Sequence, residues 1–186
     1  MLCYGGVDLV QLRAKNATAE EVRRMAKAIL PVTRAAGVPL VINDYLGVAQ
    51  AIGAEFCHLG QEDFFDGGYT RVSDLPQAPT QPKIGLSTHT PEEAQRALQA
   101  GADYLGIGPV YATDTKPTAK PVTLDYVRWA AAEVKAVPWF AIGGITLQNL
   151  DAVLEAGATR ICVVSAILKA PDIAAACRAF RSRLPR

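Results

Sequence analysis

Short apolar runs alternate with longer helical patterns along the whole sequence, and this alternation restricts the possible folds more than any other feature. The runs predict seven strands, at residues 7–12, 39–42, 56–59, 83–87, 103–107, 139–142 and 160–164. Several are almost entirely apolar, as is typical of parallel strands buried on both faces. Such strands alternating with helices predict an α/β protein with a parallel sheet, either open or closed into a barrel.

Helix signals fill the segments between these strands. Thr18-Ala-Glu-Glu21 has the pattern of a capping box, and the helix that it opens contains Pro31, which would kink or split it. Thr90-Pro91-Glu92-Glu93 places an N-cap residue before a proline and two acids, a second helix start. The predicted helices span about 18–36, 90–101, 147–156 and 172–183.

A closed barrel of parallel strands with outer helices has eight strands, one more than the sequence predicts. Because the sequence begins almost directly on a strand, we predict a TIM (β/α)8 barrel that lacks its first β/α unit, in a single domain over residues 1–186. Our hypothesis is that the native barrel has eight strands, and that residues 1–186 alone are marginally stable, oligomeric or weakly active. An open doubly wound sheet is the alternative, weakened by the lack of a G-x-G-x-x-G motif after the first strand.

Composition argues against a nucleic-acid-binding, membrane or secreted protein. The formal net charge of +1 gives no global field that would attract nucleic acid or an anionic membrane. No apolar run approaches the ~18 residues of a membrane helix, and residues 1–8 do not resemble a secretory signal. The four cysteines are scattered without a Cys-x-x-Cys pair, which argues against a metal or redox motif, and we expect Cys57 and Cys162 to be buried. These features predict a cytoplasmic protein without nucleic-acid or membrane partners, and they leave a homo-oligomer open.

In a barrel of this kind, functional side chains follow the carboxyl ends of the strands. Gln11, Arg13 and Lys15 share one face of an extended chain, and Lys15 with Lys116 could hold two sides of a polyanion. Asp44 and Asp63 follow neighbouring strands, where two carboxylates suit magnesium bound with substrate phosphates. The alternative for Asp44 is an N-cap of the helix that begins near Tyr45.

A second anion site is predicted where the last two strands end. Gly143-Gly144-Ile145 and Val164-Ser165-Ala166 are the loops between which such barrels commonly bind a phosphate on backbone N–H groups. Two ordinary turns are the alternative. Of the two histidines, His58 is expected to be a core or lining residue, whereas His89 is either an acid–base group or part of a helix start.

Eight short segments, in this order and spacing, resemble the thiamine phosphate synthase family. They are Gln11-Leu-Arg-Ala-Lys15, Ile42-Asn-Asp44, His58-Leu-Gly-Gln-Glu-Asp63, Ser87-Thr-His-Thr90, Gly106-Ile-Gly-Pro-Val110, Thr113-Asp-Thr-Lys116, Ile142-Gly-Gly-Ile145 and Val164-Ser-Ala-Ile167. The resemblance covers nearly the whole chain. It implies condensation of 4-amino-5-hydroxymethyl-2-methylpyrimidine diphosphate with thiazole phosphate, by a dissociative mechanism assisted by Mg²⁺.

The resemblance also implies a role for each matching residue. It assigns the pyrimidine diphosphate to Gln11, Arg13, Lys15, Asn43, Ser87 and Lys116, magnesium to Asp44 and Asp63, and the thiazole phosphate to Thr113, Thr115, Gly144, Val164 and Ser165. Arg13, Lys15 and Lys116 would stabilise the charge that develops on the leaving diphosphate.

Two alternatives to a synthase remain open at this point. A thiazole tautomerase on the same fold would keep the thiazole phosphate site without needing Lys15, Asn43, Asp44, Asp63 and Lys116, and their presence favours the synthase. A non-catalytic binding or regulatory relative is the other. The aromatic segment 64–69, next to Asp63, would either cover the mouth of the barrel or pack on a neighbouring surface.

Overall fold

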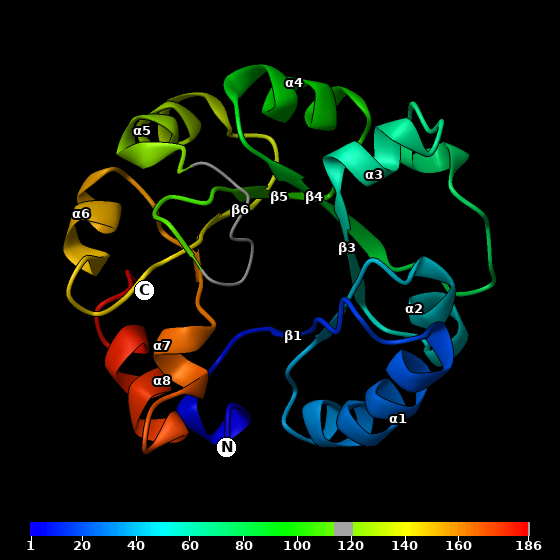
Figure 1. Cartoon of the computed structure of the whole chain (residues 1–186), viewed down its shortest axis with the longest axis horizontal. Helices are drawn as coiled ribbons and strands as arrows, with labels where there is room; N and C mark the ends of the chain where they lie inside the picture. Colours follow the sequence, from blue (N-terminus) through cyan, green and yellow to red (C-terminus); the bar gives the residue numbers. More distant parts are fainter. Residues whose placement is uncertain (114–120, 186) are drawn as a thin grey trace.

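Seven strands form one parallel sheet, and they lie side by side in the order in which they occur in the sequence. The computed structural model describes residues 1–113 and 121–185. Figure 1 shows the sheet curling around the centre of the molecule. The strands are β1 (Val10–Leu12), β2 (Leu40–Asn43), β3 (Phe56–Gly60), β4 (Lys83–Thr88), β5 (Tyr104–Ile107), β6 (Trp139–Ile142) and β7 (Ile161–Cys162).

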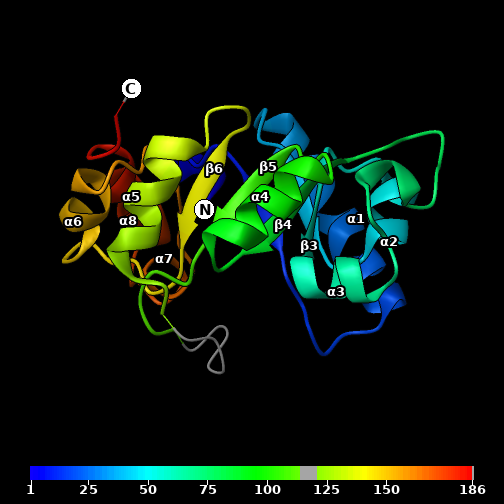
Figure 2. The same cartoon turned by 90° about the horizontal axis from the view of Figure 1, so that it is seen from above.

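Helices surround the strands in sequence order, and Figure 2 shows α1, α2 and α3 on the opposite side of the strands from α5, α6 and α8. They are α1 (Ala19–Ala35), α2 (Leu46–Ile52), α3 (Gln61–Asp66), α4 (Pro91–Gln99), α5 (Thr123–Glu133), α6 (Leu150–Glu155), α7 (Ser165–Leu168) and α8 (Ile173–Arg181), with short 3₁₀ turns at Cys3–Gly5 (η1) and Val72–Asp74 (η2). The predicted fold class is confirmed, as a (β/α) barrel architecture with seven strands.

The predicted capping box at the start of α1 is confirmed. The Thr18 hydroxyl accepts from the Glu21 N–H, and the Glu21 carboxylate accepts from the Thr18 N–H at 2.8 Å. Pro31 does not divide this helix, which continues from Ala19 to Ala35. A hydrogen bond from the Tyr45 hydroxyl to the Ala17 carbonyl then attaches the start of α1 to the end of β2.

Alternate residues of each strand face opposite sides of the sheet, which separates the apolar core from the interior of the barrel. Ile42, Leu86, Leu105 and Ile107 are fully buried, and they belong to the layer between the sheet and the helices. Burial of this layer supplies the main driving force for folding. No helix within the described residues is both long enough and apolar enough to span a membrane.

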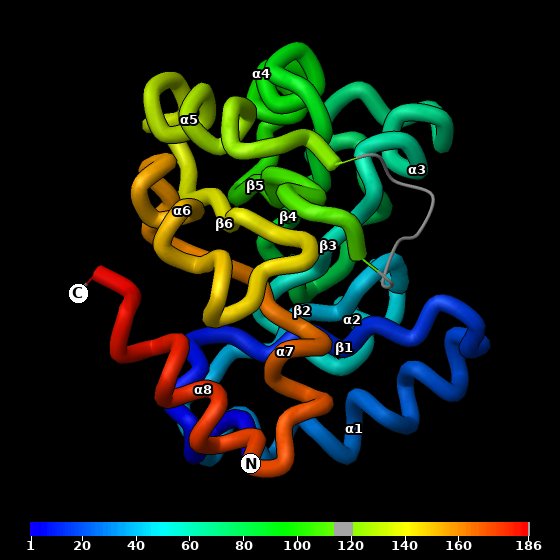
Figure 3. Tube along the Cα trace, turned by 60° about the vertical axis from the view of Figure 1, so that its left-hand side comes forward, coloured from blue at the N-terminus to red at the C-terminus, as the bar shows by residue number. Residues whose placement is uncertain are grey.

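The two edge strands are shorter than predicted. Residues 7–9 do not join β1, and Arg160, Val163 and Val164 do not join β7. Among the described residues, β1 pairs only with β2 and β7 only with β6. Residues 1–8 instead contact α8, where Gly5 packs on Cys177 and Asp8 forms an ion pair with Arg181, side by side in Figures 1 and 3.

Candidate functional site

The register of the sheet gathers polar side chains on its inner face. Asn43 is paired with His58, and Ser87 lies between Gly60 and Gly106. Paired residues of parallel strands point to the same face, so these side chains line the interior near the carboxyl ends of β2, β3 and β4. Asn43 and His58 are buried, whereas Ser87 remains partly accessible.

The predicted cations follow β1. Gln11 is exposed in β1, and Arg13 and Lys15 lie in the loop after it. Their positive charges lower the pKa of the Asp44 carboxyl, and Arg13 also lowers the pKa of His58, so both cations lie near the ends of β2 and β3.

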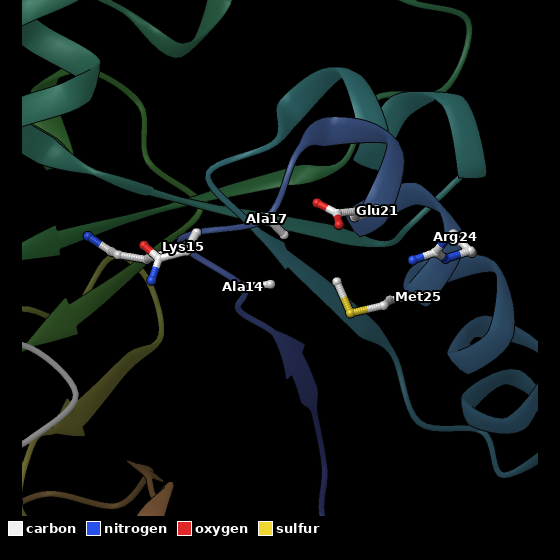
Figure 4. A pocket seen from close by; sticks show the side chains of 7 residues that line it. Ala14, Lys15, Ala17, Glu21, Arg24 and Met25 are labelled. Atoms are coloured by element: carbon white, nitrogen blue, oxygen red, sulfur yellow. The ribbon is translucent and has the colours of Figure 1, made fainter.

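Lys15 also borders an open cleft of about 460 Å³ beside the start of α1. In Figure 4 its side chain extends away from Glu21, Arg24 and Met25, which also line this cleft.

Asp44 occupies the mouth at the end of β2. Its backbone is left-handed, with φ of 67°, and its N–H donates to the His58 carbonyl at 2.9 Å. Tyr45 occupies the N-cap position of α2 without a side-chain cap, so the alternative interpretation of Asp44 as the cap is wrong. The Asp44 carboxylate is therefore available for another role.

The electrostatics of Asp44 connect it to the second carboxylate. Partial burial is the main cause that raises the pKa of Asp44, although the residue is still exposed to solvent. The negative charge of Asp63 raises this pKa further. Lys15, Arg13 and the Asn43 amide act in the opposite direction. Asp63 lies in the first turn of α3, with its carboxylate folded against Gly60 at the end of β3. The two carboxylates are thus close enough to repel each other.

This pair suits magnesium better than a metal bound by protein ligands alone. Within residues 1–113 and 121–185, no group of three or more His, Cys, Asp and Glu side chains could hold a metal ion. Magnesium usually keeps several waters and binds one or two carboxylates together with substrate phosphates. Asp44 and Asp63 fit that donor set.

His58 lies at the centre of a buried hydrogen-bond chain. Its Nε2 is 2.9 Å from the Ser87 hydroxyl, and its Nδ1 is 3.2 Å from the Tyr104 hydroxyl. Its burial confirms the expectation of a lining residue and, as the main cause, lowers its pKa to about 4. Sequence reasoning did not identify Tyr104. The available signal was Gly85, the residue paired with Tyr104 across the sheet.

The glycine loop after β6 lies against the loop after β5. Gly143 and Gly144 have φ of 95° and 66°, a region that other residues rarely adopt. A Cβ on Gly143 would come within 2.4 Å of the Pro109 side chain, and the Gly143 carbonyl accepts from the Tyr111 N–H at 3.1 Å. Both glycines are therefore required by this close approach of two loops.

The second loop of the predicted phosphate site follows β7. Ser165 begins α7, and Val164 occupies its N-cap position, exposed and without a side-chain cap. Because β6 and β7 are neighbours, this loop and the Gly143–Gly144 loop leave adjacent strands at the same end of the sheet.

The remaining predicted residues divide into three groups. His89 contacts the Gly108 carbonyl through Nδ1, and its backbone N–H donates to the Glu93 carboxylate at 2.7 Å, contacts that belong to the start of α4. Thr113 ends the described part of the loop after β5 and is partly buried, whereas Thr115 and Lys116 lie outside the described residues.

The aromatic segment next to Asp63 packs on its surroundings. Phe64 is 2 % exposed and contacts Phe65 and Tyr69. The Arg96 guanidinium on α4 lies 3.5 Å from the centre of the Phe65 ring. These contacts favour the packing interpretation of this segment.

Comparison with known proteins gives a consistent result. The family model described as thiamine monophosphate synthase matches residues 1–167. A thiamine-phosphate synthase of Thermus thermophilus is 47% identical over 97% of this chain and 84% of its own length. One from Halalkalibacterium halodurans is 41% identical, with 97% and 83% covered. A solved thiamine phosphate pyrophosphorylase from Pyrococcus furiosus superimposes with a TM-score of 0.80 at 31% identity, covering 97% of this chain and 84% of that one.

Proposed function

The chain belongs to the thiamine monophosphate synthase family, and from this premise we propose that it condenses 4-amino-5-hydroxymethyl-2-methylpyrimidine diphosphate with thiazole phosphate. The products are thiamine phosphate and pyrophosphate. The observation that best supports the proposal is the arrangement of Arg13, Lys15, Asp44 and Asp63, whose charges influence one another at the ends of β1, β2 and β3.

We assign the diphosphate to this charged end of the mouth. Arg13 and Lys15 would bind its oxygens, together with Lys116 from the loop after β5. Asp44 and Asp63 would hold Mg²⁺, which when bound neutralises diphosphate charge. Gln11, Asn43 and Ser87, on the same inner face, would contact the pyrimidine.

We assign the thiazole phosphate to the loops after β6 and β7. The backbone N–H groups of Gly144, Val164 and Ser165 would bind it, with Gly143 allowing the required loop geometry. Thr113 and Thr115 would contact the same substrate from the loop after β5. The two substrates would then meet over the centre of the barrel.

The chemistry requires stabilisation of a leaving group more than proton transfer. The bond between the pyrimidine methylene carbon and the diphosphate oxygen breaks, the oxygen keeps the electron pair, and a pyrimidine carbocation remains. The lone pair of the thiazole nitrogen then forms the new carbon–nitrogen bond. Because the diphosphate gains charge as it leaves, fixed cations favour the transition state over the ground state. The neutral ring nitrogen needs no general base.

The carboxylate pair provides the test of this proposal. Asp44→Asn and Asp63→Asn keep the size of the side chain and remove its charge, and each should reduce magnesium-dependent pyrophosphate release by roughly two orders of magnitude or more. The control is Asp66→Asn, an exposed position at the end of the same helix as Asp63, which should keep normal turnover. Normal rates in both site variants, or full activity with a chelator, would exclude the magnesium assignment.

The parent protein distinguishes a synthase from a non-catalytic relative. Mixed with both substrates and Mg²⁺, it should release one pyrophosphate for each thiamine phosphate formed. Calorimetric binding of both substrates without pyrophosphate release would instead identify a binding protein.

We infer that the protein acts in the cytoplasm on these small molecules. All four cysteines are free thiols, which suits a reducing compartment.

A further inference from the structure

We propose that Tyr104 and His58 fix the Ser87 hydroxyl as a hydrogen-bond donor toward the interior of the barrel, so that the site selects a substrate with an acceptor atom at that position. The identity of the acceptor rests on the proposed function, which makes it a ring nitrogen of the pyrimidine. Tyr104 and His58 are positioning residues in this arrangement, because they act on the substrate through Ser87.

The three side chains form a chain that runs from the buried wall to the accessible interior. Tyr104 and His58 are 7 % and 8 % exposed, whereas Ser87 is partly accessible. His58 makes one hydrogen bond at each ring nitrogen, to the Tyr104 phenol on β5 and to the Ser87 hydroxyl on β4. Only Ser87, the last member, can reach a ligand.

The direction of the chain follows from the phenol. A neutral imidazole donates through one ring nitrogen and accepts through the other. Burial favours this neutral form. Within the described part of the chain, the Tyr104 hydroxyl has His58 as its hydrogen-bond partner, and its ring is packed between Phe56 and Phe140. If Nδ1 carried the proton, the phenolic hydrogen would be left without an acceptor among apolar rings, which is costly.

The phenol therefore donates to Nδ1, and the proton of the neutral ring resides on Nε2. Nε2–H then donates to the Ser87 oxygen. The Ser87 hydrogen is left to point toward the interior, where it can donate to a ligand. A C–H group at this point would offer no acceptor to the Ser87 hydrogen.

Two glycines show that the sheet makes room for this chain. A Cβ on Gly85 would lie 2.0 Å from the Tyr104 ring, and a Cβ on Gly106 would lie 3.3 Å from His58. Gly85 is paired with both His58 and Tyr104, on the strand between them. The aromatic ring passes directly over this position to reach the imidazole.

The tautomer of His58 can be measured without substrate. In protein labelled with ¹⁵N-histidine at pH 7, the shifts and couplings of the two ring nitrogens should report a neutral ring protonated at Nε2. The protein has only two histidines, and His58→Gln identifies the signal. Tyr104→Phe should weaken this preference toward a mixture of tautomers.

Tyr126→Phe is the matched control. Tyr126 is also a buried phenol, and its hydroxyl donates to the Thr88 hydroxyl at 2.7 Å. Thr88 follows Ser87 in β4 and faces the helices rather than the interior of the barrel. Its loss should leave the His58 spectrum and the turnover unchanged. A proton on Nδ1 of the parent protein, an imidazolium at pH 7, or an equal response to both Phe variants would overturn the proposal.

The recognition part of the proposal is tested with substrate analogues. Tyr104→Phe should raise the KM for the pyrimidine diphosphate about tenfold, with a smaller effect on kcat. With the two analogues in which one ring nitrogen is replaced by C–H, the difference between the parent and the variant should disappear for one of them. A difference that persists with both analogues would refute the assigned acceptor. Absence of pyrophosphate release from the parent protein would instead refute the proposed synthase activity. The measured tautomer of His58 would still decide the direction of the hydrogen bonds from Tyr104 to Ser87.

Discussion

His58 is the residue whose burial has the largest expected effect on stability as the pH changes. Its pKa falls from 6.5 to about 4, chiefly through desolvation. Because the folded state holds the neutral ring, the contribution of His58 to stability is present above pH 6.5 and is lost as the pH falls toward 4. A shift of this size corresponds to about 3 kcal/mol of unfolding free energy.

Urea unfolding at several pH values measures this effect. Between pH 7 and pH 4, the unfolding free energy of the parent protein should fall by about 3 kcal/mol more than that of His58→Gln. Only in the parent does unfolding expose an imidazole that then binds a proton. Carboxylates elsewhere titrate in both proteins and cancel in the difference. Parallel stability curves for the two proteins would show that His58 is charged, or accessible, in the folded state.

At the scale of single elements, the start of α1 determines where the loop with Arg13 and Lys15 is anchored. The capping box at Thr18 closes the first turn, and the Tyr45 bond to Ala17 fixes the loop from the other side. Thr18→Ala should therefore reduce the unfolding free energy by about 1 kcal/mol, the usual effect of losing such a cap. It should also raise the KM for the diphosphate substrate.

Denaturant unfolding and steady-state kinetics check both effects of Thr18→Ala. Thr80→Ala, at an exposed position in the connection between η2 and β4, provides the control and should change neither quantity. A loss of stability with an unchanged KM would show that the cap does not control the loop.

Strand β4 provides a second prediction at this scale. Gly85→Ala puts a methyl group into the space of the Tyr104 ring and should cost about 1–3 kcal/mol through overpacking. Gly47→Ala is the matched substitution in α2, where nothing lies within 4 Å, and it should stabilise the protein by about 0.4–1 kcal/mol. Thermal unfolding of the two variants should thus give shifts of opposite sign. Equal shifts would mean that Tyr104 can rotate away.

Central elements were predicted from the sequence more accurately than edge elements, for a physical reason. The bounds of the predicted strand at 139–142 match β6, and those at 56–59 and 83–87 are within one residue. Periodicity identifies apolar runs, but a residue joins a strand only where a neighbouring strand pairs with it. Residues 7–9 and 163–164 lack such a neighbour among the described strands. The short helix α3 was missed because Gln61-Glu-Asp63 resembles a polar loop.

Site residues on strand ends were also predictable, since parallel strands place their carboxyl ends together. Asn43 and Ser87 lie where that rule expects them, and the charges of Arg13, Lys15 and Asp63 act on Asp44. The pairing of His58 with Tyr104 was not predictable. It depends on the register of three strands, which local pattern does not give, and Gly85 signals the space on the sheet but not which ring fills it.

At the scale of the whole molecule, hydrogen-bond pairing is uneven across the sheet. β2 to β6 are paired on both sides, with the longest registers between β3, β4 and β5, whereas β1 and β7 are three and two residues long and pair on one side among the described strands. Hydrogen exchange should therefore be slowest in β3–β5 and fastest in β1 and β7, because protection follows the local cost of opening. Mass spectrometry of peptides from each strand measures this order, and the strongest protection in β1 or β7 would contradict it.

The contact between residues 1–8 and α8 has a consequence for the order in which the protein can assemble during synthesis. Each strand pairs with the one that precedes it in the sequence, so a growing chain can add strands to the sheet as they leave the ribosome. The ion pair between Asp8 and Arg181, in contrast, joins residues 173 positions apart. It forms only after α8 has emerged, when the rest of the sheet is already available to fold. Residues 1–8 thus lack this contact until α8 has been synthesised, and a pause in translation before α8 would leave β1 without this support.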